Sequence, residues 1–230
     1  MYKYIFIDLD DTLFDFEKSE MIAFTKISSQ FAIQVTHSIL NEYKAYNKNL
    51  WKQIELGLLT KQQLVERRFP NFFDKYGVII EDGPSVDQTF RDHLAQSTQL
   101  KNGAKELLQT LKKSKRSIFA ATNGIDLTQR LRLSTTNISQ YFDNIFTSEA
   151  LGFDKPNPNF FYQAFKEIEG FDSSAAVMVG DKLSSDMKGA QNVGIDSCWF
   201  NERQEQNPNK IPITFESDSL EEICDYLLKV

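Results

Sequence analysis

From about Lys101 onward, short apolar runs alternate with segments of helical spacing, and no other feature of the chain constrains its fold as much. This alternation is typical of a parallel sheet with helices on its faces. Together with an apolar run near the start, the predicted strands span residues 3–7, 117–121, 144–147, 175–179 and 197–200. The predicted helices between and after them span residues 103–113, 127–133, 159–168, 185–193 and 220–228. The sequence therefore predicts an α/β fold with at least five strands.

Residues 15–99 interrupt the alternation, because they show helical spacing with almost no strand pattern. One predicted helix carries the stripe Leu40, Tyr43, Asn47, Leu50 and Ile54, at spacings of three and four residues. Thr60 and Gln63 form a capping box that predicts the start of another helix. We therefore expect a helical cap over residues 15–99, inserted into a core made of residues 1–14 and 100–230. A cap inserted after the first strand is expected over the carboxyl ends of the strands, where open α/β sheets bind ligands.

Composition and charge exclude several classes of function. The chain has 230 residues, of which 41% are hydrophobic and 25% charged, as in a globular protein with a sizeable core. Its net charge of −6 argues against a nucleic-acid polymer as partner. No apolar run is long enough to span a bilayer, and the first residues lack the pattern of a secretory signal, so a cytoplasmic location without membrane attachment is expected. Two cysteines, Cys198 and Cys224, are expected to be reduced thiols.

The apolar run that starts the chain delivers two carboxylates, Asp8 and Asp10, into the turn that follows it. An aspartate beside a bound cation can attack phosphorus and carry the phosphoryl group covalently, which makes Asp8 the candidate nucleophile. A second carboxylate two positions on can protonate the leaving oxygen and then deprotonate water, a role worth roughly 10² to 10⁴ in rate. Taken alone, the pattern also fits an ordinary acidic turn after a strand.

Two further candidate catalytic residues follow strands later in the chain. The strand ending in Thr122-Asn123-Gly124 offers a hydroxyl and backbone N–H groups for phosphate oxygens, and Asn123 is a candidate substrate ligand. Gly124 would let the backbone approach the phosphate closely. Lys155 precedes a proline, which holds it extended on a loop, and its charge can offset that of a nucleophile and a phosphoryl group. An ordinary Asn-Gly turn and a surface lysine are the alternative interpretations.

The strand ending in Gly180-Asp181 supplies another carboxylate, and Asp186 follows five residues later. With Asp8 and Asp10, four acids would converge on one place. Each like-charge pair at 4 Å costs about 1 kcal/mol in water and about 4 kcal/mol at an effective dielectric of 20. Mg²⁺, which prefers oxygen ligands, resolves this repulsion, so we expect it as the cofactor. For Asp186 alone, a simple charge at a helix N-terminus is the alternative.

In chain order, the motifs Asp8-x-Asp10-x-Thr12, Thr122, Lys155-Pro156 and Gly180-Asp181 with Asp186 resemble the four motifs of the haloacid dehalogenase superfamily of aspartate-nucleophile phosphotransferases. The resemblance extends over the whole chain. It implies a Rossmann-like parallel-sheet core with an inserted α-helical cap. It also implies a Mg²⁺ site formed by the side chains of Asp8 and Asp181 and the backbone carbonyl of Asp10, with Asp186 supporting or joining them. True haloacid dehalogenases lack the second acid, so Asp10 favours phosphoryl transfer over cleavage of a carbon–halogen bond.

A narrower resemblance points to the pyrimidine 5'-nucleotidase branch of this superfamily. It rests on residues 43–51, on residues 60–69 and on Thr122-Asn123-Gly124. It implies a Mg²⁺-dependent phosphomonoesterase of nucleotide metabolism that acts on nucleoside monophosphates with a pyrimidine preference. A sugar-phosphate or general small-metabolite phosphatase is the alternative within the fold. A phosphomutase and a catalytically silent binding module are further alternatives, and a monomer or a homodimer is expected.

The cap offers candidate substrate ligands. Asn47 interrupts an apolar stripe, and a buried amide needs partners that a base edge can supply. Trp51, Phe14 and Phe69 are candidates for stacking on a pyrimidine, and Arg67 for contacting a base carbonyl or the phosphate. In the alternative interpretation, these aromatic residues form the core of the cap and Asn47 bonds within it.

Overall fold

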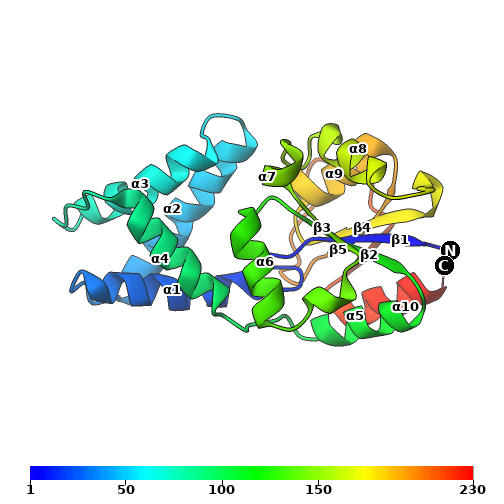
Figure 1. The fold of residues 1–230 in the computed structure, drawn as a ribbon, viewed down its shortest axis with the longest axis horizontal. Helices are drawn as coiled ribbons and strands as arrows, with labels where there is room; N and C mark the ends of the chain where they lie inside the picture. The colour runs from blue at the N-terminus through cyan, green and yellow to red at the C-terminus, as the bar shows by residue number, and fades with distance from the viewer. Residues whose placement is uncertain (230) are drawn as a thin grey trace. The chain divides into compact units, whose positions relative to one another are not determined.

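The computed structural model describes residues 1–229 and divides into two compact units. The core unit contains residues 1–16 and 98–230, and the helical unit contains residues 17–97. Figure 1 shows the strands gathered in the first and only helices and loops in the second. Among the helices of the described chain, none combines the length and the apolar character that crossing a bilayer requires.

The helical unit is the segment expected to act as a cap, and its role in choosing a substrate stays a prediction.

The core unit is built on one parallel sheet of six strands. The strands are β1 (Tyr4–Ile7), β2 (Ser117–Thr122), β3 (Asn144–Thr147), β4 (Ala176–Gly180), β5 (Asp196–Phe200) and β6 (Phe215–Ser217). They lie in the order β3-β2-β1-β4-β5-β6, and every neighbouring pair is parallel. In the centre, Ile5 of β1 lies opposite Ile118 of β2 and Val177 of β4. The predicted α/β fold with a Rossmann-like parallel sheet is confirmed.

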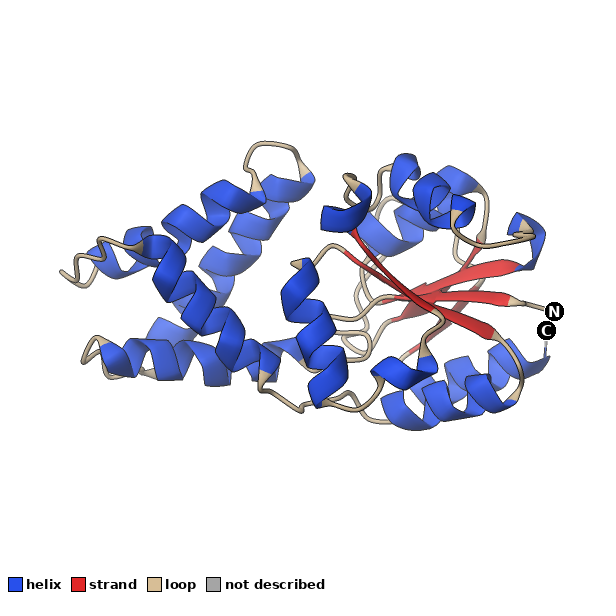
Figure 2. Cartoon of the chain, viewed as in Figure 1, coloured by secondary structure: helices blue, strands red, loops and turns tan. Residues whose placement is uncertain are grey.

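Helices cover both faces of this sheet (Figure 2). They are α5 (Ala104–Lys113), α6 (Asp126–Thr135), α7 (Ser148–Leu151), α8 (Pro158–Lys166), α9 (Lys188–Val193) and α10 (Leu220–Lys229). Side chains alternate across β1, because successive residues of a strand point to opposite faces. Ile5 and Ile7 pack into a buried cluster with leucines of α5 and α10, whereas Tyr4 and Phe6 pack into another with phenylalanines of α8. Burial on both faces explains why the strands read as continuous apolar runs.

The helical unit contains α1 (Phe16–Gln30), which starts in the core unit, α2 (His37–Glu55), α3 (Lys61–Asp74) and α4 (Gly83–Ala95). The predicted capping box at the start of α3 is present, with Thr60 and Gln63 each bonding the other's backbone N–H. Aromatic rings fill the interior, and Phe24 of α1 stacks on Tyr43 of α2 with ring centroids 3.9 Å apart.

A buried polar network crosses the interior of the helical unit. Arg68 of α3 donates through Nε to Asp87 of α4 at 2.9 Å, and Arg91 donates to the other oxygen of the same carboxylate at 2.8 Å. Asn47 of α2 donates to Glu20 of α1 at 2.5 Å and accepts a bond from Arg68 at 3.3 Å. Because buried charges are costly unless paired, this network fixes how the four helices pack.

The two ends of the inserted segment meet within the core unit. Asp15 donates its N–H to the carbonyl of Gln99 at 3.1 Å, and Lys101 donates its N–H to the carbonyl of Leu13 at 2.8 Å. Between these bonds, Phe14 and Leu100 form an isolated antiparallel bridge. The chain therefore leaves the core unit and returns to it at one place, just after the turn that holds Asp8 and Asp10.

Candidate active site

The carboxyl ends of the central strands bring the predicted catalytic residues together. Asp8 follows β1, Thr122 ends β2 and Asp181 follows β4. These three strands are adjacent and parallel, so their ends lie at the same edge of the sheet. Strand order reverses its direction at β1, since β2 and β3 lie on one side of it and β4 to β6 on the other. This is the edge and the point in the sheet where open α/β folds bind their ligands.

Lys155 is the centre of this site. Its ammonium group donates to Asp8 Oδ1 at 2.7 Å, to Asp186 Oδ1 at 2.6 Å and to the carbonyl of Ala121 at 2.5 Å. The side chain is 1% exposed, so these three acceptors replace its hydration shell. The surface-lysine alternative is therefore wrong.

Asn123 fixes the loop that carries Lys155. Its side-chain amide donates to the carbonyl of Lys155 at 2.9 Å, and its side-chain oxygen accepts the N–H of Lys155 at 2.8 Å. Both ends of the side-chain amide therefore bond the backbone of Lys155. The structure places Asn123 as a support for Lys155, and a direct contact with substrate stays a prediction.

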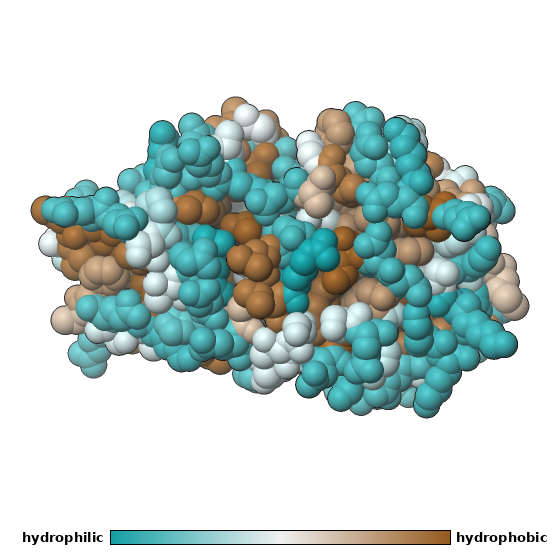
Figure 3. Space-filling model, viewed as in Figure 1, coloured by the Kyte–Doolittle hydropathy of each residue, from teal (hydrophilic) through white to brown (hydrophobic). Residues whose placement is uncertain are grey.

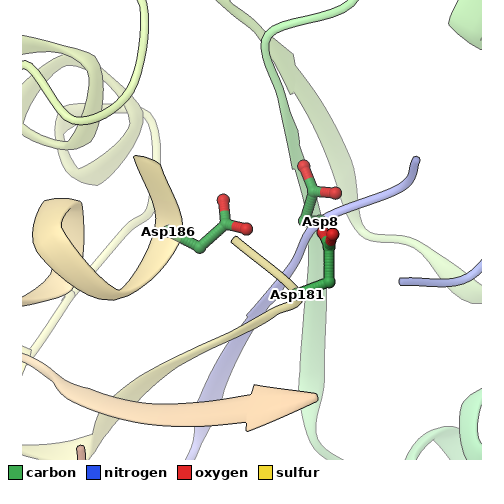
Figure 4. A group of neighbouring side chains, drawn as sticks. All are labelled: Asp8, Asp181 and Asp186. Atoms are coloured by element: carbon green, nitrogen blue, oxygen red, sulfur yellow. The ribbon is translucent and has the colours of Figure 1, made fainter. Parts of the chain in front are cut away.

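Three carboxylates, those of Asp8, Asp181 and Asp186, lie close together at this edge of the sheet (Figure 4). One oxygen each from Asp8, Asp181 and Asp186 lies within 4.8 Å of the others. A single lysine among three carboxylates leaves an excess of negative charge, which a divalent cation with oxygen ligands would neutralise. The donor set thus fits Mg²⁺. Ligation by the backbone carbonyl of Asp10 stays a prediction.

The protonation of the cluster reflects this crowding. Burial raises the pKa of Asp8 to about 7, Lys155 opposes that rise, and Asp186 adds to it. Burial, with the nearby charges of Asp8 and Asp186, raises the pKa of Asp181 well above its ordinary value. Burial lowers the pKa of Lys155, but Asp186 and Asp8 more than offset this and raise it above its ordinary value. The raised pKa of Lys155 keeps its ammonium group charged at neutral pH, and the raised pKa values of Asp8 and Asp181 show that their ionised forms lack sufficient positive charge nearby.

Neighbouring groups hold Asp181 in place. The indole N–H of Trp199 donates to the backbone carbonyl of Asp181 at 2.8 Å, and Trp199 is fully buried in β5. The hydroxyl of Thr12 lies 3.2 Å from Asp181 Oδ1 and 3.4 Å from Asp8 Oδ2. Thr12 thus links the turn after β1 to the turn after β4.

Asp186 lies in a helical turn over residues Leu183–Met187 that leads into α9. Its second oxygen accepts the N–H of Lys182 at 3.1 Å. A methyl group added at Gly180 would collide with the Asp186 carboxylate, so the absent side chain at Gly180 makes room for it. The interpretation of Asp186 as a simple helix-end charge is wrong, because it is buried and paired with Lys155.

Asp10 is held by two residues that the sequence did not single out. Gln129 of α6 donates to Asp10 Oδ2 at 2.5 Å, and Arg132 of α6 forms an ion pair with Asp10 Oδ1. Gln129 also donates to the hydroxyl oxygen of Thr122 at 3.3 Å. The signal available in the sequence was two polar residues at i and i+3 in a helix directly after the Thr122 turn.

Gly124 makes room for the side chain of Gln129, because an added methyl group there would collide with the Gln129 amide. A close approach of the Gly124 backbone to phosphate stays a prediction.

The predicted substrate ligands of the cap belong to the helical unit. Asn47 is buried and bonds Glu20 and Arg68, so its amide already has partners inside this unit, as the alternative interpretation stated. Trp51 is half-buried and packs on a small cluster of Leu50, Ile54 and Leu64. Arg67 is exposed, and its contact with substrate stays a prediction.

Two of the predicted stacking residues are unsuited to that role. Phe14 and Phe69 are each 0% exposed, so neither ring offers a free face to a base. Phe69 lies in the aromatic interior of the helical unit, and Phe14 lies under the guanidinium of Arg132 in the core unit. The stacking prediction for these two residues is wrong.

A parallel sheet of this order, with polar side chains gathered at its carboxyl edge, is typical of α/β enzymes. The chain belongs to the haloacid dehalogenase-like hydrolases, whose family description matches residues 4–200. This confirms the predicted family and the prediction that the chain is an enzyme that catalyses hydrolysis.

Individual relatives agree over nearly the full length. The chain is 35% identical to the pyrimidine 5'-nucleotidase PynA of Streptococcus pneumoniae over 228 residues, which cover 99% of this chain and 96% of the relative. It is 32% identical to the pyrimidine 5'-nucleotidase YjjG of Escherichia coli, with 99% of both chains covered. Among solved structures, the putative hydrolase YfnB of Bacillus subtilis, bound to magnesium, is 33% identical and superimposes with a TM-score of 0.91 over 98% of both chains.

Proposed function

We propose that this hydrolase is a Mg²⁺-dependent phosphomonoesterase that dephosphorylates nucleoside monophosphates, with a preference for pyrimidines, through an aspartyl-phosphate at Asp8. The observation that carries the proposal is the cluster in which Lys155 bonds both Asp8 and Asp186, with Asp181 alongside. The nucleotide preference is supported by the two pyrimidine 5'-nucleotidases among its relatives.

In the first half-reaction, an oxygen of Asp8 attacks phosphorus while the bond from phosphorus to the ester oxygen breaks. Asp10 gives its proton to that leaving oxygen, and the nucleoside departs as an alcohol. In the second half-reaction, water attacks the phosphorus of the aspartyl-phosphate, Asp10 takes a proton from the water, and the bond from phosphorus to Asp8 breaks. Inorganic phosphate leaves, and both carboxylates return to their initial state.

The remaining residues of the site bind and orient charge. Thr122 accepts bonds at its hydroxyl oxygen from Gly124 N–H at 3.0 Å and from Gln129 at 3.3 Å, which leaves its hydroxyl hydrogen to donate to a phosphate oxygen. Lys155 offsets charge on Asp8 as phosphate approaches. Asp8, Asp181 and Asp186 would hold Mg²⁺. The ion would supply positive charge that reduces the repulsion between the Asp8 carboxylate and the phosphate group.

A substrate panel tests this proposal. Phosphate release is measured from nucleoside and deoxynucleoside monophosphates and from sugar phosphates, with Mg²⁺ and with chelator. Chelator-sensitive activity that favours pyrimidine nucleotides is expected. Faster turnover of sugar phosphates would replace the nucleotidase with the alternative phosphatase, and substantial activity in Asp8→Asn would refute the aspartyl-phosphate mechanism.

A further inference from the structure

Helix α6 buries two polar side chains in the core unit and leaves two of its leucines largely in solvent, although Leu133 is buried and the exposed side also carries the Arg130–Asp126 ion pair. Gln129 and Arg132, three residues apart, are 2% and 1% exposed. Leu127 and Leu131, by contrast, are 56% and 42% exposed. Figure 3 shows apolar side chains gathered on the surface over α6. Burying an amide and a guanidinium costs free energy unless they are paired, so their partners matter.

The partner that Gln129 and Arg132 share is Asp10. The Gln129 amide donates to Oδ2 at 2.5 Å, and Arg132 pairs with Oδ1. Arg132 also donates to the side-chain oxygen of Gln129 at 3.2 Å, so the two donors are bonded to each other. The Asp10 carboxylate is therefore held at both oxygens by one rigid helix face, although its side chain is 30% exposed.

Arg132 is poorly explained by stability alone. Its guanidinium lies 4.0 Å from the centre of the Phe14 ring and 5.7 Å from that of Phe16, which shields it from water. Its Nε and one terminal nitrogen are buried without a hydrogen-bond partner among the described residues. Unpaired buried donors destabilise a fold, and an apolar side chain would avoid that cost.

We propose that Gln129 and Arg132 are positioning residues that orient Asp10 for proton transfer to the leaving oxygen and from water. This inference rests on the proposed function. A carboxylate has about four lone-pair positions, and the two donors occupy one on each oxygen. One position on each oxygen is left to carry the proton that Asp10 gives to the ester oxygen and later takes from water. The carboxyl group thus transfers protons without giving up either contact.

The test compares substrates whose leaving groups differ in their need for a proton. The ester oxygen of a nucleoside monophosphate must be protonated so that the nucleoside leaves as an alcohol, whereas 2,4-dinitrophenolate leaves without a proton. The variant Arg132→Met is expected to lower kcat/KM for a nucleoside monophosphate by about 10²-fold, the lower end of the effect of general acid catalysis. For 2,4-dinitrophenyl phosphate, kcat/KM is expected to change little. Asp10→Asn is expected to show the same dependence on the leaving group, more strongly.

Arg130→Met is the matched control, because Arg130 lies on the same helix and pairs with Asp126 at its exposed side. It should leave both substrates unaffected. Equal losses for the two esters in Arg132→Met would overturn the inference and leave the proposed function standing. A wild-type enzyme that hydrolyses neither ester would overturn the proposed function and this inference with it.

A second variant keeps the test decisive if Arg132→Met fails to fold. Gln129→Leu removes the bond to Asp10 Oδ2 while Arg132 stays in place. It is expected to slow the nucleoside ester more than the dinitrophenyl ester, and a uniform loss would again overturn the inference.

Discussion

Replacing Asp8 by asparagine should stabilise the metal-free protein while it removes the proposed nucleophile. Burial raises the pKa of Asp8 from 3.8 to about 7, despite the opposing charge of Lys155. A carboxyl group with a raised pKa stabilises the fold fully at acidic pH, and this contribution is lost as the pH rises from about 4 to about 7. At about 1.4 kcal/mol for each unit, this raised pKa lowers the free energy of unfolding, relative to that at acidic pH, by up to about 4 kcal/mol at pH 8 and by about 2 kcal/mol at pH 5.5. Asparagine, which stays neutral, avoids this cost.

The assay is urea unfolding of both proteins in chelator at pH 5.5 and pH 8. Asp8→Asn should have the larger free energy of unfolding at both values, and its advantage should grow by about 2 kcal/mol between them. Glu169→Gln, at an exposed position, is the control and should stay within about 0.5 kcal/mol of wild type at both pH values.

Addition of Mg²⁺ should reduce the difference between the two proteins. A ligand at 100 times its Kd stabilises the protein that binds it by about 2.7 kcal/mol, and the variant lacks one carboxylate of the proposed site. The reasoning is refuted if the variant is less stable than wild type in chelator at pH 8, or if its advantage does not grow with pH.

Three further predictions follow from described contacts. Gly180→Ala should weaken Mg²⁺ binding and turnover together, measured by titration calorimetry and phosphate release, because the methyl group displaces the Asp186 carboxylate; unchanged Mg²⁺ affinity would contradict it. Arg68→Met should lower the free energy of unfolding by about 1–3 kcal/mol, because the buried Asp87 carboxylate loses one of its two cationic partners and keeps Arg91, whereas the exposed neighbour Arg67→Met should change it by less than about 0.5 kcal/mol; similar effects of both would contradict it. Burial raises the pKa of the Cys198 thiol to about 12, so this thiol should not react with a disulfide reagent at pH 8 until the protein unfolds, and rapid reaction in the native state would contradict it.

The residues at the carboxyl edge of the sheet could be predicted from the sequence because each of them directly follows or ends an apolar run. An apolar run followed by a polar residue marks the end of a strand, and parallel strands bring their ends together. Asp8, Thr122 and Asp181 needed only this rule to be placed side by side. The last strand, β6, escaped prediction because it is a three-residue edge strand, too short to show a period.

The residues that were missed or misjudged are those whose role depends on which way a helix is turned or on how deeply a side chain is buried. Periodicity shows that α6 has two sides, but it does not show which side faces Asp10, and so Arg132 was missed. Composition shows many aromatic residues, but it does not separate those with an open face from Phe14 and Phe69, which have none. Asn47 was predicted correctly as a buried amide that needs partners, but those partners come from helices whose packing no spacing rule supplies.

The paired backbone at Asp15 and Gln99 has a consequence for how this chain can change length. Paired backbone segments lie about 5 Å apart, as neighbouring strands do. The two ends of the inserted segment are therefore close together in the core unit, and hydrogen bonds hold them there. The entropy of closing a loop grows only slowly with its length, by about 0.6 kcal/mol for each doubling. Insertions of very different lengths can therefore be exchanged at this place with little penalty to the sheet, and the residues at the strand ends stay where they are.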